Sequence, residues 1–334
     1  MKVERMTSLD ALERAQEEWD DFLFSSEHKC IFLTNEWFVS WWKSFSEDNS
    51  FEILIFTDEN KDIAGIAPFM IKDKNIRFIA NQEVSDYCDF ITKKEKRSEF
   101  YENLLGYLKT NYSQMEGVEL INVHQSSPTL SFLPELANSH GFSCACQEIE
   151  VAPVLSLPAS YESYLDLLGK KNRHELRRKL KRIESLDKIR VLKVTDPQEL
   201  RIHTEAFIKL HQNSTSSKEK FWQKEGMTGF FRELIYRFSL KGWIELRVLL
   251  YGKKAIAALL NFSFFDSLYF YNSTFDKEYA WYSPGLFLFH QSLREAIQEQ
   301  KKQADFLRGD EKYKYSLGAQ DNKIFQIFLR ANRR

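Results

Sequence analysis

The stretch from Asp266 to Gln298 limits the possible folds more than any other part of this chain. Its first part, SLYFYNSTF (267–275), is a short aromatic and β-branched run bounded by charged residues, which predicts a strand. Ser-Pro-Gly (283–285) then precedes LFLFHQSLREAIQ, where apolar residues recur at three- and four-residue steps. Serine suits the N-cap of a helix and proline its first position, so the stretch predicts a strand, a turn and a helix.

The start of this helix has two interpretations. The N–H groups of a first helical turn are unpaired and carry a partial positive charge, which suits a phosphate group. The alternative is an ordinary β-α unit whose helix is simply well capped.

Composition and charge exclude several classes of protein. The 334 residues suffice for two domains or one large one, and the 43% of apolar residues provide ample material for buried cores. No segment approaches the roughly 18 consecutive apolar residues of a membrane span, and the N-terminal stretch lacks the apolar core of a secretory signal. A net charge of −1 does not argue for nucleic acid binding, and the four cysteines show no metal-site pattern. We therefore expect a cytoplasmic protein with no metal and no transmembrane segment.

The predicted elements follow a similar order in the two halves of the chain. In each half, helices come first, then a hairpin whose second strand reads IAGIAPFM or IAALLNFSF, then further strands and a helix. Helices are expected at 8–24, 35–45, 94–110, 126–141, 160–171, 197–213, 228–241 and 285–300. Strands are expected at 51–72, 76–81, 84–92, 118–124, 142–157, 191–196, 244–275, 304–309 and 323–330, and an irregular link at 216–227. The repetition predicts two α/β domains that meet near residues 150–160.

Several motifs resemble those of a known family. A Gly242-Trp243 strand entry is followed in order by IAALLNF, YFYNSTFDKEYAWYSPG and DFLRGDEKYK (305–314). The basic stretch KKNRHELRRKLKRIE (170–184) and, in the first half, TNEWFVSWWKSF and IAGIAPFM also match. Over nearly its whole length the chain resembles the CelD/BcsL-like acetyltransferases of the GNAT superfamily, which are related to the Fem-type peptidoglycan aminoacyltransferases.

The resemblance implies two tandem GNAT-like domains, each a mixed, mostly antiparallel sheet flanked by helices. The first, at 1–155, would be degenerate, and the second, at 156–334, would be the acyltransferase. In such domains acyl-CoA binds where a central strand, here Leu268–Phe275, splays from its neighbour, and the pantetheine amides pair with that strand. The residues implied to bind the donor are Tyr271 and Ser273 on the strand, and Ser283, Gly285 and Leu286 at the start of the next helix. The usual phosphate loop is richer in glycine, and proline at position 284 removes one N–H donor.

Acyl transfer to an amine needs a deprotonated amine, donors for the developing oxyanion and an acid for the leaving thiolate. Asp276 ends the central strand, where donor and acceptor would meet. It is the first candidate for a base, or for a group that holds the amine. The alternative is a turn aspartate, because aspartate is common in turns.

The segment DFLRGDEKYK is the densest polar cluster of the chain, and it follows a predicted strand whose end should face a ligand. Tyr313 is a candidate acid for the thiolate, and Lys314 a second candidate catalytic residue. Lys314 or Arg308 could hold a phosphate or carboxylate, with Asp310 beside them in the substrate site. The alternative is a salt-bridged turn. We expect a cavity lined by Asp276, Arg308 and Lys314 beside the central strand.

The basic stretch 170–184 is predicted to be an amphipathic helix on which Arg173 and Arg177 belong to one column of like charges. Such columns destabilise a free helix by a few tenths of a kcal/mol per pair, which a bound anion would relieve. Candidate anions are the CoA phosphates, a polysaccharide or nucleotide-linked acceptor, or a tRNA; the alternative is a solvated face. His211 is a further candidate for the acceptor site, although a surface histidine is the simpler interpretation.

Three functions are compatible with these features. The first is an N-acyltransferase that moves an acyl group, acetyl above all, from CoA to an amine of a sugar or cell-envelope precursor. The second is a Fem-like transferase that takes an amino acid from aminoacyl-tRNA. The near-neutral net charge and the lack of a long coiled-coil arm favour CoA over tRNA. The third is a non-catalytic module that grips an anionic glycan.

Overall fold

The computed structural model describes residues 1–46, 50–112 and 114–332, and the chain divides into two compact units. Unit 1 consists of residues 1–150 together with 322–334, and unit 2 of residues 151–321. The mixed α/β fold with two units confirms the predicted fold class. In this division the chain passes from unit 1 to unit 2 after residue 150, and residues 322–334 return to unit 1. Domains at 1–155 and 156–334 stay a prediction.

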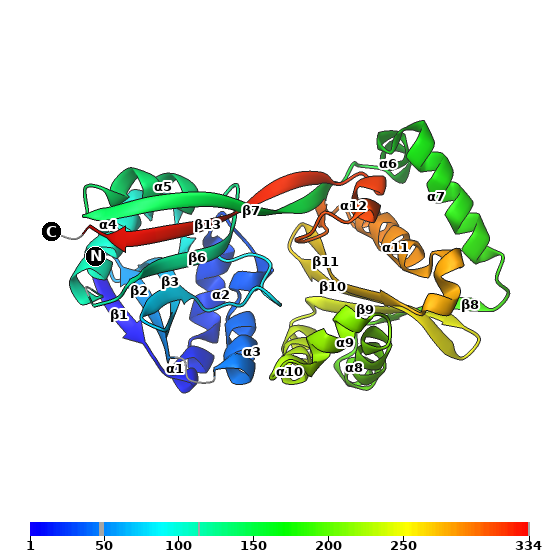
Figure 1. The fold of residues 1–334 in the computed structure, drawn as a ribbon, viewed down its shortest axis with the longest axis horizontal. Helices are drawn as coiled ribbons and strands as arrows, with labels where there is room; N and C mark the ends of the chain where they lie inside the picture. Colours follow the sequence, from blue (N-terminus) through cyan, green and yellow to red (C-terminus); the bar gives the residue numbers. More distant parts are fainter. Residues whose placement is uncertain (47–49, 113, 333–334) are drawn as a thin grey trace. The chain divides into compact units, whose positions relative to one another are not determined.

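Unit 1 is built on a sheet in the order β1-β2-β3-β4-β6-β13-β7, with β5 paired to β3 (Figure 1). Its strands are β1 (Lys2–Met6), β2 (Ser50–Thr57), β3 (Ile63–Lys72), β4 (Asn75–Phe78), β5 (Ile91–Thr92), β6 (Gly117–His124), β7 (Phe142–Ser156) and β13 (Gln320–Ala331). Its helices are α1 (Leu9–Arg14), α2 (Gln16–Ser25), α3 (Asn35–Phe45), α4 (Arg97–Asn111) and α5 (Thr129–Ala137). A continuous apolar core lies between the sheet and the helices α4 and α5.

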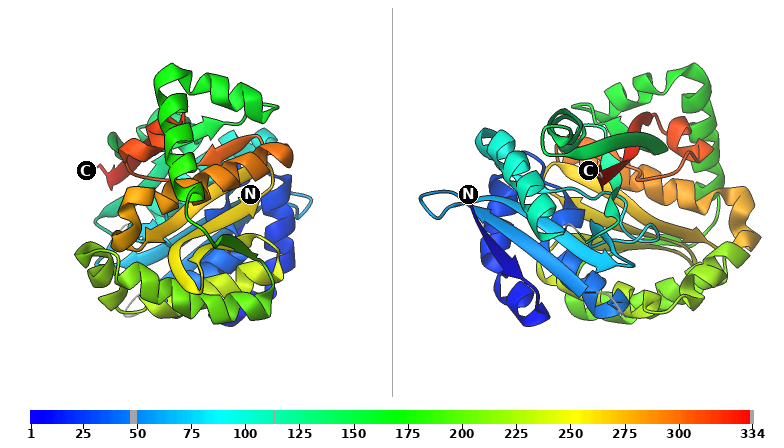
Figure 2. Two further views of the ribbon diagram at one scale, coloured as in Figure 1. Left: turned by 90° about the vertical axis from the view of Figure 1, so that its right-hand side faces the viewer. Right: turned by 60° about the vertical axis from the view of Figure 1, so that its left-hand side comes forward.

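Unit 2 takes the end of β7 into a sheet of order β7-β12-β11-β10-β9-β8. The other strands are β8 (Ile189–Val194), β9 (Ile244–Tyr251), β10 (Lys254–Phe264), β11 (Ser267–Phe275) and β12 (Gln303–Asp305). The helices are α6 (Tyr161–Leu167), α7 (Gly169–Glu184), α8 (Pro197–Gln212), α9 (Ser216–Gln223), α10 (Met227–Leu240), α11 (Pro284–Gln298) and α12 (Lys312–Ser316). Figures 1 and 2 show α8, α9 and α10 on one face of β8–β11 and α11 and α7 on the opposite face.

Several local predictions were wrong. The helix expected at 160–171 ends at Leu167, and the strand expected at 304–309 ends at Asp305. The helix expected at 8–24 is two helices that meet at Ala15, and the strand expected at 84–92 shrinks to β5. The link 216–227 contains a real helix, α9, whose first turn is capped by the side chain of Thr215. Ser283 has a left-handed backbone (φ 55°), so its side chain makes no cap hydrogen bond to α11, although Pro284 does occupy the first turn. By contrast, Asp196 caps α8 as its sequence position suggests.

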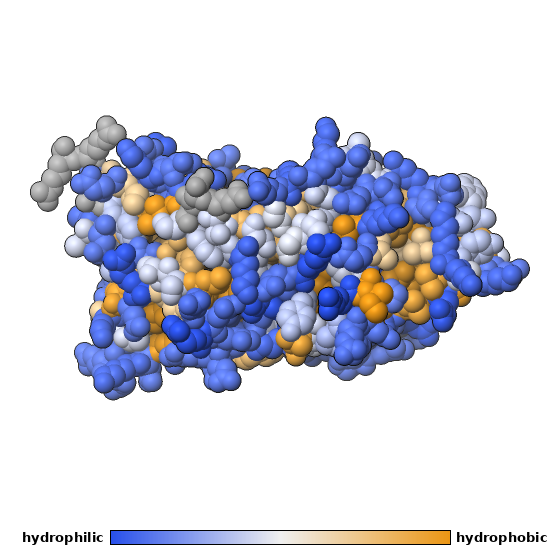
Figure 3. All heavy atoms as spheres, turned by 90° about the horizontal axis from the view of Figure 1, so that it is seen from below, coloured by the Kyte–Doolittle hydropathy of each residue, from blue (hydrophilic) through white to orange (hydrophobic). Residues whose placement is uncertain are grey.

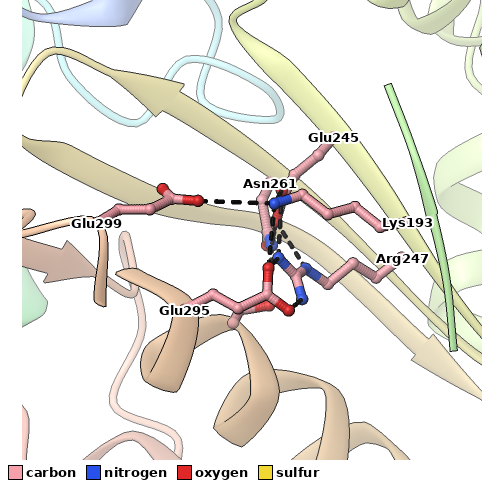
Figure 4. A network of polar contacts seen from close by, with 7 residues as sticks. Lys193, Glu245, Arg247, Asn261, Glu295 and Glu299 are labelled. Carbon is pink, nitrogen blue, oxygen red and sulfur yellow. Dashed lines mark hydrogen bonds and ion pairs between the residues drawn. The ribbon is translucent and has the colours of Figure 1, made fainter. Parts of the chain in front are cut away.

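A buried charge network ties α11 to the sheet of unit 2 (Figure 4). The guanidinium of Arg247 on β9, whose side chain is only 2% exposed, bonds Glu245 (Nε–Oε1 2.7 Å) and Glu295 of α11 (Nη2–Oε2 2.6 Å). Lys193 from β8 bonds both carboxylates, and Asn261 donates to Glu245. The network fixes the C-terminal half of α11 and thereby holds the direction of its N-terminus.

On the face drawn in Figure 3, hydrophobic residues form separate patches among hydrophilic ones. Within the described residues, no helix has the length and apolar character needed to cross a membrane.

Candidate active site

The two parallel strands β11 and β12 separate soon after they begin to pair. Their ladder joins residues 267–269 to residues 303–305, and only three residue pairs take part. β11 continues to Phe275, six residues past the last pair, while β12 ends at Asp305. The predicted central strand therefore does part from its neighbour.

The divergence has a cause in the chain that follows β12. The N–H of Phe306 donates to the carbonyl of Pro153 (3.0 Å) and that of Gly309 to Val151 (2.9 Å). The segment after β12 thus stays beside β7 instead of β11. The second half of β11 then has β10 on one side and an open edge on the other.

Ser273 directs its backbone groups to this open edge. The N–H of Asp276 donates to Ile256 of β10 (2.9 Å), and successive residues of a strand point in alternate directions. The N–H and C=O of Ser273 therefore point away from β10. Closer to the point where β11 and β12 separate, the pairing between β10 and β11 skips Tyr271, which therefore forms a β-bulge. A bulge changes the direction of a side chain. The ring of Tyr271 packs on those of Phe262 and Phe231, with ring centres 4.5 Å and 5.8 Å away.

The N-terminus of α11 lies at the end of this strand. A Cβ at Gly285 would meet only the ring of Phe275, at 3.7 Å, which is an ordinary contact. The packing of the chain itself therefore does not require glycine here. Leu286 in the same turn lines a small opening with Lys179 and Asn172 of α7.

The basic helix α7 is anchored to the turn before α11, a 3-10 helix at Lys277–Tyr282. Arg182 Nη1 donates to the carbonyl of Trp281 (2.6 Å), and its guanidinium lies 3.8 Å from the centre of that indole ring. Arg173, predicted to bind an anion, instead bonds Asp166 (2.5 Å), and Arg177 is exposed near Tyr161. Lys179, which the sequence did not single out, lines the opening beside Leu286 and pairs there with Glu175 (3.6 Å).

Asp276 has the contacts of a turn aspartate. Its carboxylate accepts a hydrogen bond from the N–H of Glu278 (3.0 Å) and pairs with Lys254 (2.8 Å). The hydrogen bond from Lys254 holds the pKa of Asp276 below its ordinary value. A carboxylate stabilised in this way is a poor base, so the contacts favour the structural alternative.

Lys314 is buried in a cage of backbone carbonyls. Its ammonium donates to the carbonyls of Leu307 (3.0 Å), Arg308 (2.8 Å) and Gly309 (3.0 Å), and pairs with Glu311 (2.9 Å). Leu307 and Gly309 both have positive φ, 59° and 107°, which turns these carbonyls inward. Lys314 thus shapes the loop that leaves β12. Asp310 is exposed and Arg308 is half-buried. Asp276 pairs with Lys254 and Lys314 with Glu311, and the cavity expected between Asp276, Arg308 and Lys314 stays a prediction.

Tyr313 packs beneath the same loop. Its ring lies 4.9 Å from Phe289 of α11 and 6.3 Å from Phe306. Burial, together with Glu311, raises the pKa of the phenol above its ordinary value. Tyr313 therefore keeps its proton at neutral pH, as a proton donor must.

His211 is buried, not a surface residue, with 3% of its area exposed. The indole N–H of Trp222 on α9 donates to its Nδ1 (2.9 Å). Burial, with Lys218 nearby, lowers the pKa of His211 to about 3, so the ring is neutral and its proton must be on Nε2. No hydrogen bond of normal geometry satisfies that buried N–H among the described residues, and the side chain of Asn272 on β11 is the polar group beside it.

Lys218 of α9 reaches the open edge of β11. Its ammonium donates to the carbonyl of Ser273 (2.5 Å). Burial lowers the pKa of Lys218 to about 8, and Glu311 acts in the opposite direction. Sequence analysis missed this residue because it treated 216–227 as an irregular link. The Thr215 cap was the signal that a helix begins there.

Within the described residues, no cluster of three or more histidine, cysteine, aspartate or glutamate side chains could hold a metal ion.

Comparison with known proteins finds a similarity over most of unit 2. Residues 170–315 match the model of the acetyltransferase (GNAT) domain. The match covers less than half of the chain, and it shows that this region is similar to a GNAT acetyltransferase domain. Within it lie β8–β12, the α11 N-terminus and the loop that carries Lys314. The expected enzyme class, a GNAT-type acyltransferase, is confirmed at this level, whereas the match does not distinguish a CelD/BcsL-like specificity.

Solved structures share the fold across the whole chain. FemX aligns with a TM-score of 0.63 at 12% identity, covering 97% of this chain and 96% of its own. L-PGS from Bacillus licheniformis aligns with a TM-score of 0.60 at 10% identity, covering 95% and 91%. A tandem GNAT protein from the clavulanic acid biosynthesis pathway aligns with a TM-score of 0.53 at 9% identity, covering 98% of each chain. These similarities show a tandem GNAT fold. A search of curated protein sequences finds no match.

Proposed function

We propose that the GNAT domain of unit 2 is an N-acyltransferase that uses acyl-CoA, with acetyl-CoA as the first donor to test. The observation that carries this proposal is the open edge of β11 from Phe270 to Phe275. Backbone groups on such an edge can pair with the amides of an extended pantetheine chain, which would share or replace the bond of Lys218 to the Ser273 carbonyl. The α11 N-terminus follows directly, so its free N–H groups can receive the pyrophosphate.

The start of α11 has few donors for a pyrophosphate, because Pro284 has no N–H. We infer that α7 compensates with positive charge. Lys179 lines the opening beside Leu286, and the contact of Arg182 with Trp281 holds α7 in place. Gly285 leaves the approach to the first turn unobstructed.

The chemical step would be direct attack. The amine nitrogen bonds to the thioester carbonyl carbon, the C–S bond breaks, and the thiolate leaves with a proton from an acid. Tyr313, which keeps its proton, is our candidate for that acid. Lys218, at the open edge of β11, is our candidate for the group that takes the proton of the amine, because a lysine with a pKa of about 8 is partly neutral at neutral to slightly alkaline pH.

The neutral His211 would act as a hydrogen-bond donor through Nε2, since its Nδ1 is already occupied by Trp222. Asp276 and Lys314 would hold the ends of β11 and β12 in shape. For the acceptor we retain an amine of a sugar or cell-envelope precursor.

A thermal-shift series with CoA, acetyl-CoA, longer acyl-CoAs and nucleotide sugars tests the donor. A ligand present at 100 times its Kd should stabilise the protein by about 2.7 kcal/mol. Stabilisation by CoA compounds supports the proposal, and the acyl chain with the largest effect identifies the preferred donor. If none of the CoA compounds raises Tm, the donor assignment is wrong.

A second candidate is transfer of an amino acid from aminoacyl-tRNA, favoured by the similarity of the fold to FemX. Charged tRNA should then bind with an affinity that falls steeply with salt, because counterions are released. The third candidate, a binding module without catalysis, would be favoured if an anionic glycan stabilised the protein and no acyl donor did.

A further inference from the structure

Unit 1 contains a cavity of about 520 Å³ that is open to solvent. Its floor is a row of neighbouring residues on three strands, since Met70 of β3 lies opposite Arg77 of β4, and Arg77 lies opposite Glu119 of β6. Trp41 and Phe45 of α3 form one wall. The volume falls in the usual range for small-molecule sites, roughly 300–1,000 Å³.

The opposite wall is a preformed turn. The side chain of Asn81 accepts hydrogen bonds from the N–H groups of Glu83 (3.0 Å) and Val84 (3.1 Å). The chain then returns to β6, where Asn122 donates to the carbonyl of Ser85 (2.6 Å). Because hydrogen bonds hold both ends of the turn, the cavity exists without a ligand.

Two side chains that line this cavity have buried donors with no acceptor. Trp41 is 2% exposed, and neither its Nε1–H nor the Nε–H of Arg77 has a hydrogen-bond partner within the described part of the chain. A buried donor left unsatisfied costs about 1–3 kcal/mol. Two such groups at one cavity are complementary to a ligand that brings an acceptor.

The carboxylate of Glu119 does not fill this need. It pairs with Arg77 through Nη2 (2.7 Å) and also accepts from Gln326 (2.6 Å), while Nε of Arg77 remains unsatisfied. The wall that α3 forms is aromatic, with the rings of Trp41 and Phe45 5.6 Å apart, and Met70 is buried in the lining. Lys72 and Gln82 add polar groups to the rest of the lining. An aromatic wall of this kind suits a flat ring.

We propose that this cavity is a binding site for a small ring compound that presents a carbonyl or carboxylate oxygen to Trp41 and Arg77. The ring would pack against Phe45 and Met70. This site lies in unit 1 and does not depend on the acyl transfer proposed for unit 2.

Saturation-transfer NMR and calorimetric titration of the full chain test the proposal with three probes. Uridine represents a carbonyl-bearing heterocycle, benzoate a cyclic carboxylate, and inorganic phosphate an acceptor without a ring. We expect uridine or benzoate, but not phosphate, to bind with a Kd below about 1 mM, near the weak end of specific binding. The better of the two identifies the source of the oxygen. Absence of binding by both, or binding of phosphate alone, overturns the proposal.

Variants locate the bound probe. Trp41→Phe keeps a ring but removes the N–H, and Arg77→Met removes the guanidinium; each should weaken binding about fivefold or more, which corresponds to one lost hydrogen bond. Trp42→Phe is the matched control, because Trp42 packs on Phe51 (4.6 Å) and does not line the cavity. Circular dichroism checks that each variant is folded, and Arg77→Met alone decides the question if Trp41→Phe is not. A Kd unchanged in the folded variants would place the probe elsewhere and refute the inference.

Discussion

The indole nitrogen of Trp222 donates a hydrogen bond to Nδ1 of His211 across 2.9 Å, and thereby leaves the imidazole with its proton on Nε2. A neutral ring in this tautomer can donate a hydrogen bond but cannot accept a proton through Nε2. The pair joins α8 to α9 beside the open edge of β11. His211 is therefore suited to stabilise negative charge on an oxygen, as a donor of the oxyanion-hole kind.

The first prediction concerns His211→Gln. We expect kcat/KM to fall about 100-fold, as for the loss of one oxyanion donor, with unchanged affinity for CoA. The pKa of His211 is about 3, so the ring is neutral throughout pH 5–9 and does not titrate there. The shape of the pH–rate profile should therefore be the same in the variant. Disappearance of an inflection near pH 6.5 would show that His211 is a base after all.

The second prediction concerns Lys218, whose pKa of about 8 lies well below that of a free lysine because of burial. Its neutral form gains population as pH rises through 8, so kcat/KM should rise with an inflection near that value. Lys218→Arg keeps the charge but cannot become neutral, and it should remove the inflection and lower the rate about 100-fold. The exposed Lys220 on the same helix gives the control, Lys220→Arg, which should match the parent enzyme. An inflection near pH 8 that survives in Lys218→Arg would exclude this role.

The third prediction separates stability from binding at Gly285. Alanine fits, since a Cβ meets only Phe275 at 3.7 Å, and it should stabilise the helix by up to about 0.5–1 kcal/mol. The added methyl group narrows the approach to the first turn of α11, so calorimetry should show a several-fold higher Kd for CoA. Gly106→Ala in α4, where nothing lies within 4 Å of the new Cβ, is the control. It should raise Tm without any effect on CoA. Equal CoA affinity in all three proteins would argue against phosphate binding at α11.

The fourth prediction distinguishes two neighbours on α12, Tyr313 and Lys314. Lys314→Met leaves three carbonyls without their ammonium and should lower the free energy of unfolding by about 2–4 kcal/mol. Tyr313→Phe retains the packing on Phe289 and should change stability by less than about 1 kcal/mol while kcat falls. Urea denaturation and steady-state kinetics measure the two effects. Full activity in Tyr313→Phe would remove it as the acid.

The fifth prediction tests the charge network of Figure 4. Arg247→Met leaves Glu245 buried, with Lys193 and Asn261 as its remaining partners among the described residues, and should destabilise the protein by about 3–5 kcal/mol in urea denaturation. Arg232→Met breaks a pair with Glu205 in which both side chains are 56% exposed, and should cost less than about 1 kcal/mol. Similar losses in both variants would contradict the assigned importance of burial.

The sequence predicts the framework of the site well because periodicity and capping are local signals. Residues 267–275 form β11, and proline at 284 begins α11 as expected. The parting of β11 from β12 follows from the family resemblance and is present in the structure. Its cause, hydrogen bonds from Phe306 and Gly309 to β7, joins residues about 150 positions apart and leaves no local pattern.

The roles of single polar residues are less predictable, since they depend on contacts between elements. The segment DFLRGDEKYK suggests that Lys314 is free to bind an anion. In the structure, the positive φ angles of Leu307 and Gly309 direct backbone carbonyls toward its ammonium. His211 reads as a surface residue, yet Trp222, eleven positions later, covers it once α9 forms. Both errors arise from backbone geometry that amino-acid type alone does not specify.

The strand β13 lies between β6 and β7 in the sheet of unit 1, although all of unit 2 precedes it in the chain. During synthesis on the ribosome, the sheet of unit 1 therefore lacks a central strand until residues 151–321 have been made. The edges of β6 and β7 stay exposed for that interval, which makes them targets for chaperones or for mispairing between nascent chains. A fragment that ends before residue 320 would lack β13, so the edges of β6 and β7 would stay exposed in it.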